Sequence, residues 1–166
     1  LQRIYGDVRF NSTRFVQNQT PKDFTHGGGI AILRSHQATN FTFDHCQFEE
    51  NSANERGGGI YVNGADNLIH LINSSFYRNS AKLSGGVLFV VIAQSLTVTN
   101  CTFGENEAGN SGGALAVVMS SLEMIISQSS FLGNKAWMFG GAVSVGSTLT
   151  IHESHFKFNE AWENGG

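Results

Sequence analysis

The chain is poor in proline, cysteine, charge and long apolar runs. Its 166 residues include one proline and two cysteines, and 14% are charged, against about 25% in an average soluble domain. The net charge of −3 comes with scattered lysines and arginines. Nucleic-acid partners are therefore not expected, because they need a basic stripe. The longest apolar run, Val87 to Ala93, is too short for a transmembrane segment.

Glycine, by contrast, is abundant at twenty residues, and it marks an internal repeat. The stretch "FYRNSAKLSGG" at 76–86 returns as "FGENEAGNSGG" at 103–113, "FLGNKAWMFGG" at 131–141 and "FKFNEAWENGG" at 156–166. An earlier copy, "FEENSANERGG", lies at 48–58. The repeat length of about 27 residues lies in the range of solenoid proteins.

The interior of the repeat predicts strands. Segments such as "GGIYVN" and "GGVLFVV" are short and rich in β-branched residues. In "FTFDHC" and "LTVTNC", apolar and polar residues alternate. Both patterns are typical of strands, and a third short strand fits around each Phe-x-x-Asn. We therefore expect an all-β fold, a parallel β-helix of about six turns of about 27 residues with three short strands per turn. Residues 1–166 are expected to form one segment of a longer repeat protein.

Two columns of side chains are expected to form structural ladders. In a stacked solenoid each residue contacts its own counterparts in the turns above and below. Phenylalanine suits an interior stack, and an asparagine amide suits a corner where it can bond the backbone or the next amide. The expected members are Phe48, Phe76, Phe103, Phe131 and Phe156, and Asn51, Asn79, Asn106, Asn134 and Asn159.

The alternation of FxxN with a double glycine and a small or aliphatic residue, as in Gly113-Ala114 and Gly141-Ala142, resembles the repeats of the chlamydial polymorphic outer membrane proteins. The resemblance covers essentially the whole chain. It implies a right-handed parallel β-helix that is displayed outside the cell, often in adhesion. The pattern differs where Ile30, Ile60 or Val87 follows the double glycine.

Cysteines and sequons indicate the compartment. Cys46 and Cys101 occupy one column two turns apart, about 9–10 Å, which is too far for a disulfide, so we expect two buried free thiols. Five Asn-x-Ser/Thr sequences are candidate N-glycosylation sites. An extracellular or cell-surface location is therefore expected. The candidate sites are Asn11, Asn18, Asn40, Asn73 and Asn100.

Neither a catalytic site, a metal site nor a cofactor is expected. Glycan-cleaving β-helix enzymes need carboxylates that converge on one sheet face, and the segments after the double glycines carry none. Glu105 and Glu107 lie beside the asparagine corner, where solvated edge residues are expected. His152 and His155 have no Cys or Asp beside them to complete a metal site.

The segment after each double glycine is apolar at both alternating positions, and the sequence leaves open which set faces outward. A water-facing sheet normally alternates with polar residues, so the outward set predicts a contact surface. One set is Ile30, Ile60, Val87, Ala114 and Ala142, and the other is Ala31, Tyr61, Leu88, Leu115 and Val143. The preceding corner becomes aromatic in the last repeats. The candidate partner-binding residues are Tyr61, Leu88, Leu115, Trp137, Met138, Phe139, Val143 and Trp162.

The sequence thus favours a non-enzymatic extracellular scaffold, structural or adhesive. Its expected partner is a protein, either a second copy of the chain or another surface or matrix protein. The alternative is a glycan-binding or carbohydrate-active β-helix of the pectin-lyase type. Exposed tryptophans fit both, because they concentrate binding energy.

Overall fold

The computed structural model describes residues 6–21, 25–33, 39–118, 122–163 and 165, and these residues form strands and corners without an α-helix. The strands make four parallel sheets. Sheet I contains β1 (Val8–Asn11), β4 (Thr39–Asp44), β8 (Asn67–Ile72), β12 (Ser95–Thr99), β16 (Glu123–Ser127) and β20 (Thr148–His152). Sheet II contains β2 (Arg14–Val16), β5 (Gln47–Glu49), β9 (Ser75–Tyr77), β13 (Thr102–Gly104), β17 (Ser130–Leu132) and β21 (His155–Lys157).

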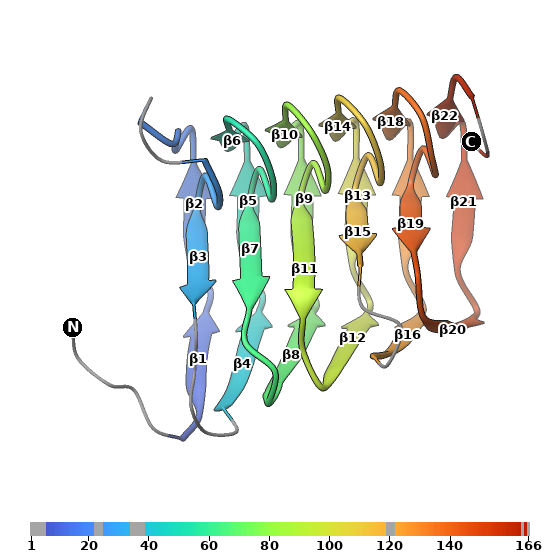
Figure 1. The fold of residues 1–166 in the computed structure, drawn as a ribbon. Helices are drawn as coiled ribbons and strands as arrows, with labels where there is room; N and C mark the ends of the chain where they lie inside the picture. Colours follow the sequence, from blue (N-terminus) through green and yellow to red (C-terminus); the bar gives the residue numbers. More distant parts are fainter. Residues whose placement is uncertain (1–5, 22–24, 34–38, 119–121, 164, 166) are drawn as a thin grey trace.

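The other two sheets complete the circuit of each turn. Sheet III contains β6 (Ser52–Ala53), β10 (Ser80–Ala81), β14 (Glu107–Ala108), β18 (Lys135–Ala136) and β22 (Glu160–Ala161). Sheet IV contains β3 (Ile30–Leu33), β7 (Ile60–Asn63), β11 (Leu88–Ile92), β15 (Leu115–Val117) and β19 (Val143–Val145). The chain passes through sheets I to IV in order and then repeats, so the fold is the predicted all-β parallel β-helix (Figure 1).

The predicted count of strands and turns needs correction. Each complete turn has four strands, because the chain around Phe-x-x-Asn is divided by a left-handed residue such as Glu50, with φ of 55°. Four turns place a strand in every sheet: β4–β7, β8–β11, β12–β15 and β16–β19. The flanking turns are incomplete among the described residues. In the first, Gln19 makes only a single bridge to Ser52 where sheet III would begin.

Three corners of each turn use left-handed backbone, and the third requires glycine. At Gly112 φ is +64°, and a Cβ on the following Gly113 would overlap the backbone oxygen of Gly141 in the next turn. Any residue with a side chain is thus excluded from this glycine pair. The first two corners carry varied residues, and each one other than glycine costs about 1–2 kcal/mol in this conformation. They are Ser12, His45, Asn73, Asn100, Gln128 and Glu153, and Gln17, Glu50, Arg78, Glu105, Gly133 and Phe158.

The interior is filled by the phenylalanine stack that the repeat predicts. The rings of Phe76, Phe103 and Phe131 are fully buried and nearly parallel, with centroids 4.7 and 4.5 Å apart. Phe48 stacks on Phe76 at 5.3 Å and Phe156 on Phe131 at 4.6 Å. Offset stacking of this kind contributes about 0.5–1.5 kcal/mol per pair beyond the burial of apolar area.

The asparagine ladder satisfies its buried amides along the solenoid axis. The Nδ2 of Asn106 donates to the backbone oxygen of Phe76 at 3.0 Å and to the Oδ1 of Asn134 at 2.9 Å. Its own Oδ1 accepts from the backbone N of Asn79 at 2.9 Å and from Asn79 Nδ2 at 3.1 Å. Every strong donor and acceptor of this side chain therefore has a partner, so complete burial of the amide leaves none of its polar atoms unsatisfied.

Candidate functional site

Three predicted contact residues, Leu88, Leu115 and Val143, belong to the interior of the β-helix. Leu88 and Leu115 are fully buried in the hydrophobic core. Leu115 pairs with Leu88 on one side and with Val143 on the other, and Ile60 continues the same column. These aliphatic side chains fill the solenoid and do not form an external stripe. Their assignment to a contact surface was wrong.

The error lies in which glycine is equivalent from turn to turn. The two predicted columns count residues from the last glycine of each pair or triplet, whereas the first glycine shares the left-handed φ, as at Gly57 and Gly85. Ile60 consequently pairs with Leu88, and Tyr61 pairs with Phe89. A one-residue slip moves every side chain of a strand to the other face. The outward column of sheet IV is Ala31, Tyr61, Phe89, Ala116 and Ser144.

Tyr61 faces outward, which is one of the two orientations that the sequence left open, but other side chains cover it. It is 5% exposed and packs with Phe89 and Ala116 in a small cluster outside sheet IV. The ring of His26 stacks on Tyr61 at 4.3 Å, and the guanidinium of Arg56 lies 5.2 Å from the centre of the Phe89 ring. Sequence reasoning missed this cover, since His26 and Arg56 come before the glycines.

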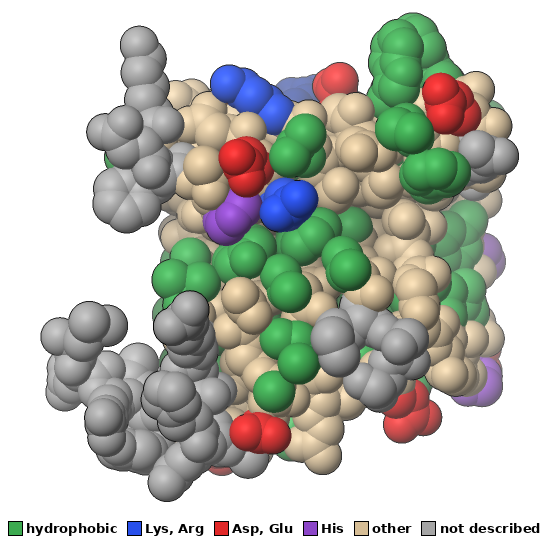
Figure 2. Space-filling view, in the orientation of Figure 1, with side chains coloured by type: hydrophobic (Ala, Val, Ile, Leu, Met, Phe, Trp, Pro, Cys, Tyr) green, Lys and Arg blue, Asp and Glu red, His purple; other side chains and the backbone are tan. Residues whose placement is uncertain are grey.

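Charged groups lie at the rim of this covered cluster. Figure 2 shows Arg, Glu and His side chains side by side above the hydrophobic centre of sheet IV. The Oε2 of Glu55 is 3.8 Å from His26 Nδ1. Burial lowers the pKa of His26, and the Glu55 carboxylate opposes that shift only in part. His26 is therefore a neutral, partly buried ring that seals the cluster.

The tryptophans remain exposed and lie together. Trp137 follows β18 and Trp162 follows β22, with ring centroids 4.2 Å apart and an angle of 37° between the planes. Their side chains are 52% and 68% exposed, and Phe139 beside them is 43% exposed. Figure 2 shows hydrophobic side chains gathered over this end of sheet III. We call Trp137, Met138, Phe139 and Trp162 the Trp corner.

The same column is not aromatic in earlier turns. The residues after β6, β10 and β14 are Asn54, Lys82 and Gly109. The Trp pair is thus confined to two neighbouring turns, where the backbone N of Trp162 donates to the oxygen of Trp137 at 3.2 Å. A stacking requirement common to all turns does not explain these tryptophans, because the solenoid accepts glycine at their position.

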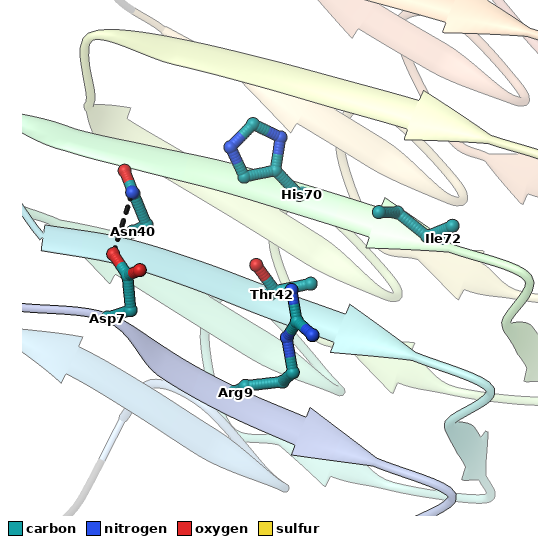
Figure 3. Close-up of a pocket in the computed structure, with 6 residues that line it drawn as sticks. All are labelled: Asp7, Arg9, Asn40, Thr42, His70 and Ile72. Carbon is teal, nitrogen blue, oxygen red and sulfur yellow. Dashed lines mark hydrogen bonds between the residues drawn. The ribbon is translucent and has the colours of Figure 1, made fainter.

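A polar depression of about 600 Å³ lies on the outer face of sheet I (Figure 3). Its walls come from β1, β4 and β8 and the residue before β1. Sequence reasoning missed it, although the outward positions of three stacked strands are the signal that could have found it. We call it the sheet I depression, lined by Asp7, Arg9, Asn40, Thr42, His70 and Ile72.

The carboxylates near the asparagine corner form surface contacts. Glu105 accepts hydrogen bonds from Tyr77 Oη at 2.9 Å and Arg78 Nε at 3.0 Å. The Arg78 bond, followed by that of Tyr77, holds the pKa of Glu105 below its usual value. Lys135 and Glu160 form an exposed ion pair at 3.2 Å. Glu105 and Glu160 thus each contact a side chain of a neighbouring turn and do not converge on one site.

The candidate N-glycosylation asparagines lie on sheet I or at the left-handed corners. Asn100 is exposed, and its Nδ2 donates to Asn73 Oδ1 at 2.8 Å. Asn18 extends the ladder by donating to Asn51 Oδ1 at 2.8 Å. Their glycosylation stays a prediction, and it concerns Asn11, Asn18, Asn40, Asn73 and Asn100.

The two cysteines are free and buried, as predicted. Ser74 lies between them in the column, and its Oγ accepts from the backbone N of Cys46 at 2.9 Å. Burial raises the pKa of the Cys101 thiol to about 12 and also raises that of Cys46. Neither thiol is a nucleophile at neutral pH, because nucleophilic attack requires the thiolate.

No three His, Cys, Asp or Glu side chains come close enough to hold a metal ion within the described ranges. The part of the chain that the structure describes also contains no apolar helix of membrane-spanning length. Searches among curated proteins and among solved structures find no match to this chain. A family described as the right-handed β-helix region matches residues 4–165, nearly the whole chain. Its stacked parallel sheets and this match together show that the chain belongs to the right-handed β-helix family.

Proposed function

We propose that this right-handed β-helix is a non-enzymatic extracellular scaffold that binds a protein partner through the Trp corner. The observation that carries the proposal is the exposure of Trp137 and Trp162, 52% and 68%, on an otherwise regular solenoid. Trp is enriched among the residues that dominate binding energy in protein interfaces. The column tolerates Asn54, Lys82 and Gly109 in other turns, so folding alone does not call for aromatic residues there.

The rest of the molecule suits a rigid support. The phenylalanine stack and the asparagine ladder fix each turn to its neighbours, so the Trp corner is held directly after the short strands β18 and β22. Preorganised contact residues lose less conformational entropy on binding than flexible ones do. We further propose that the repeats are of the polymorphic outer membrane protein type and act at the cell surface in adhesion, which the FxxN and glycine-pair pattern supports.

The proposal is tested by adhesion and self-association of the purified protein. Surfaces coated with it should retain cells, or sedimentation velocity should show association that grows with concentration. The double variant Trp137→Ala, Trp162→Ala should lose this binding, whereas Leu132→Ala, which truncates an exposed apolar residue on sheet II, should keep it. Binding that survives in the double variant, or no binding by the unmodified protein in either assay, contradicts the proposal.

A second candidate function, glycan binding, is favoured by a different surface. The sheet I depression, of about 600 Å³, gathers polar side chains from neighbouring strands on the outer face of sheet I.

A further inference from the structure

The sheet I depression is built by side chains from three neighbouring turns. Arg9 pairs with Thr42, and Thr42 pairs with His70, so these residues form one outward column across β1, β4 and β8. Figure 3 shows Asp7 and Asn40 facing each other at one side, with His70 above Thr42 and Ile72 further along β8. The positions of the lining residues other than Asp7 are fixed by the register of β1, β4 and β8.

Several hydrogen-bonding groups in the depression are left for a ligand. Arg9 makes no hydrogen bond or ion pair with any residue that the structure describes, so its guanidinium offers its full set of donors. His70 uses Nδ1 for a 2.6 Å bond with Thr97 Oγ1, which leaves Nε2. Asp7 Oδ1 accepts from Asn40 Nδ2 at 2.7 Å, which leaves Asp7 Oδ2 as an acceptor.

The charges in the depression balance one another. Asp7 carries one negative charge and Arg9 one positive charge, while Asn40, Thr42 and Ile72 carry none. An anion such as phosphate would meet the Asp7 carboxylate, and a cation would meet Arg9. A neutral ligand with several hydroxyl groups avoids both repulsions. Its hydroxyls can donate to a carboxylate and accept from a guanidinium at once.

We propose that the sheet I depression binds a neutral saccharide. Its hydroxyls donate to Asp7, accept from Arg9 and share a hydrogen bond with His70 Nε2, and its C–H face lies against Ile72. The depression is open and polar, so the affinity is weak, with a Kd on the order of 1 mM. This inference does not depend on the Trp corner, which follows strands of sheet III and not of sheet I.

The saccharide has two possible sources, because Asn40 begins the sequon Asn40-Phe41-Thr42. A free glycan would enter from solvent, while an N-glycan on Asn40 would be attached at the rim and fold back into the depression. Protein produced in bacteria carries no such N-glycan and therefore tests the first source. Protein from a eukaryotic secretory host, with Asn40 occupancy read by peptide mass spectrometry, tests the second.

The test is a titration followed by ¹H–¹⁵N NMR, which suits a 17.9 kDa chain. The probes are D-glucose, D-galactose, D-mannose and N-acetylglucosamine and their β-linked disaccharides, at up to about 20 mM so that a millimolar Kd is reached. Glucuronic acid and glucosamine serve as charged comparisons. At least one neutral sugar should shift the amides of Arg9, Thr42 and His70 more than either charged sugar does.

Matched variants locate the binding. Arg9→Gln should weaken the sugar about tenfold, the effect of losing one charge-assisted hydrogen bond, and Arg14→Gln, an exposed arginine on sheet II, should leave it unchanged. Unshifted spectra away from the substitution show that both variants are folded. In glycosylated protein, an occupied Asn40 should reproduce the shifts of these amides without added sugar.

Three results would overturn the proposal. They are the absence of any shift in unglycosylated and Asn40-occupied protein, a preference for the charged sugars, and shifts confined to Trp137 and Trp162. The last result would support glycan binding at the Trp corner and remove the sheet I depression as its site. A failure here leaves the adhesion assay of the Trp variants unaffected, so the two proposals fail separately.

Discussion

The substitution Asn106→Ala tests the energetic role of the asparagine ladder. It removes an amide that is fully buried. The backbone oxygen of Phe76 loses the donor at 3.0 Å, and Asn79 loses the acceptor of both its backbone N and its Nδ2. Each buried polar group left without a partner costs about 1–3 kcal/mol. With two or three groups affected, the free energy of unfolding should fall by about 2–9 kcal/mol, against about 5–15 kcal/mol for a typical domain.

The assay is guanidinium unfolding followed by far-ultraviolet circular dichroism, with the slope of the transition compared between variants. Asn18→Ala is the matched control. The Asn18 side chain is exposed and donates one bond to Asn51 Oδ1, which also accepts from the backbone N of Asn18 at 3.1 Å. Its loss should lie below about 1 kcal/mol. Equal losses in the two variants, or a loss below about 1.5 kcal/mol for Asn106→Ala, would refute this account of the ladder.

Three further outcomes follow from the geometry. Gly113→Ala should prevent folding because the new Cβ would overlap the backbone of the next turn. Gly133→Ala, whose Cβ meets only a side-chain carbon at 3.9 Å, should cost about 1–2 kcal/mol for the left-handed backbone. Both variants are measured by thermal unfolding, and similar melting temperatures would contradict the glycine requirement. Leu115→Asp should abolish folding because the side chain lies in the interior. Ala116→Asp, on the outer face of the same strand, should destabilise the fold less. A soluble, folded Leu115→Asp variant would show that the assigned register is wrong. The pKa of Cys101 is about 12 in the folded protein and about 8.5 in the unfolded chain, so the unfolded thiol ionises first. The free energy of unfolding should therefore fall as pH rises from about 8.5 towards 12. Cys101→Ser should flatten this pH dependence, and an unchanged dependence would exclude the thiol as its cause.

The sequence predicts those parts of the fold that depend on like residues stacking. Phe76 and Phe103 recur because a ring must lie on a ring, and Asn79 and Asn106 recur because an amide must bond an amide. Such columns are visible in one sequence. The first two corners are not, because their left-handed residues, such as Glu50, share a backbone conformation and no side-chain type. The fourth strand per turn was missed for this reason.

The exposure of the candidate contact residues was predicted in part. The aromatic run "AWMFGG" pointed to Trp137, whose side chain is indeed exposed, because no stacking requirement accounts for it. Leu88 was misassigned because both alternating positions of its strand are apolar, so only the register of the glycine corner separates inside from outside. The sheet I depression escaped notice because Arg9 and His70 lie in different turns, and their proximity depends on exact stacking.

The one-to-one contact between turns has a consequence for how such a chain can change in length. Removing residues 76–102 would bring Phe103 onto Phe48 and Asn106 beneath Asn51, and both new neighbours are chemically the same as the old ones. Duplicating that stretch would be accommodated in the same way. A gene encoding this rod can therefore gain or lose whole turns by recombination between its own copies, while deletions of any other size would set unlike side chains against each other.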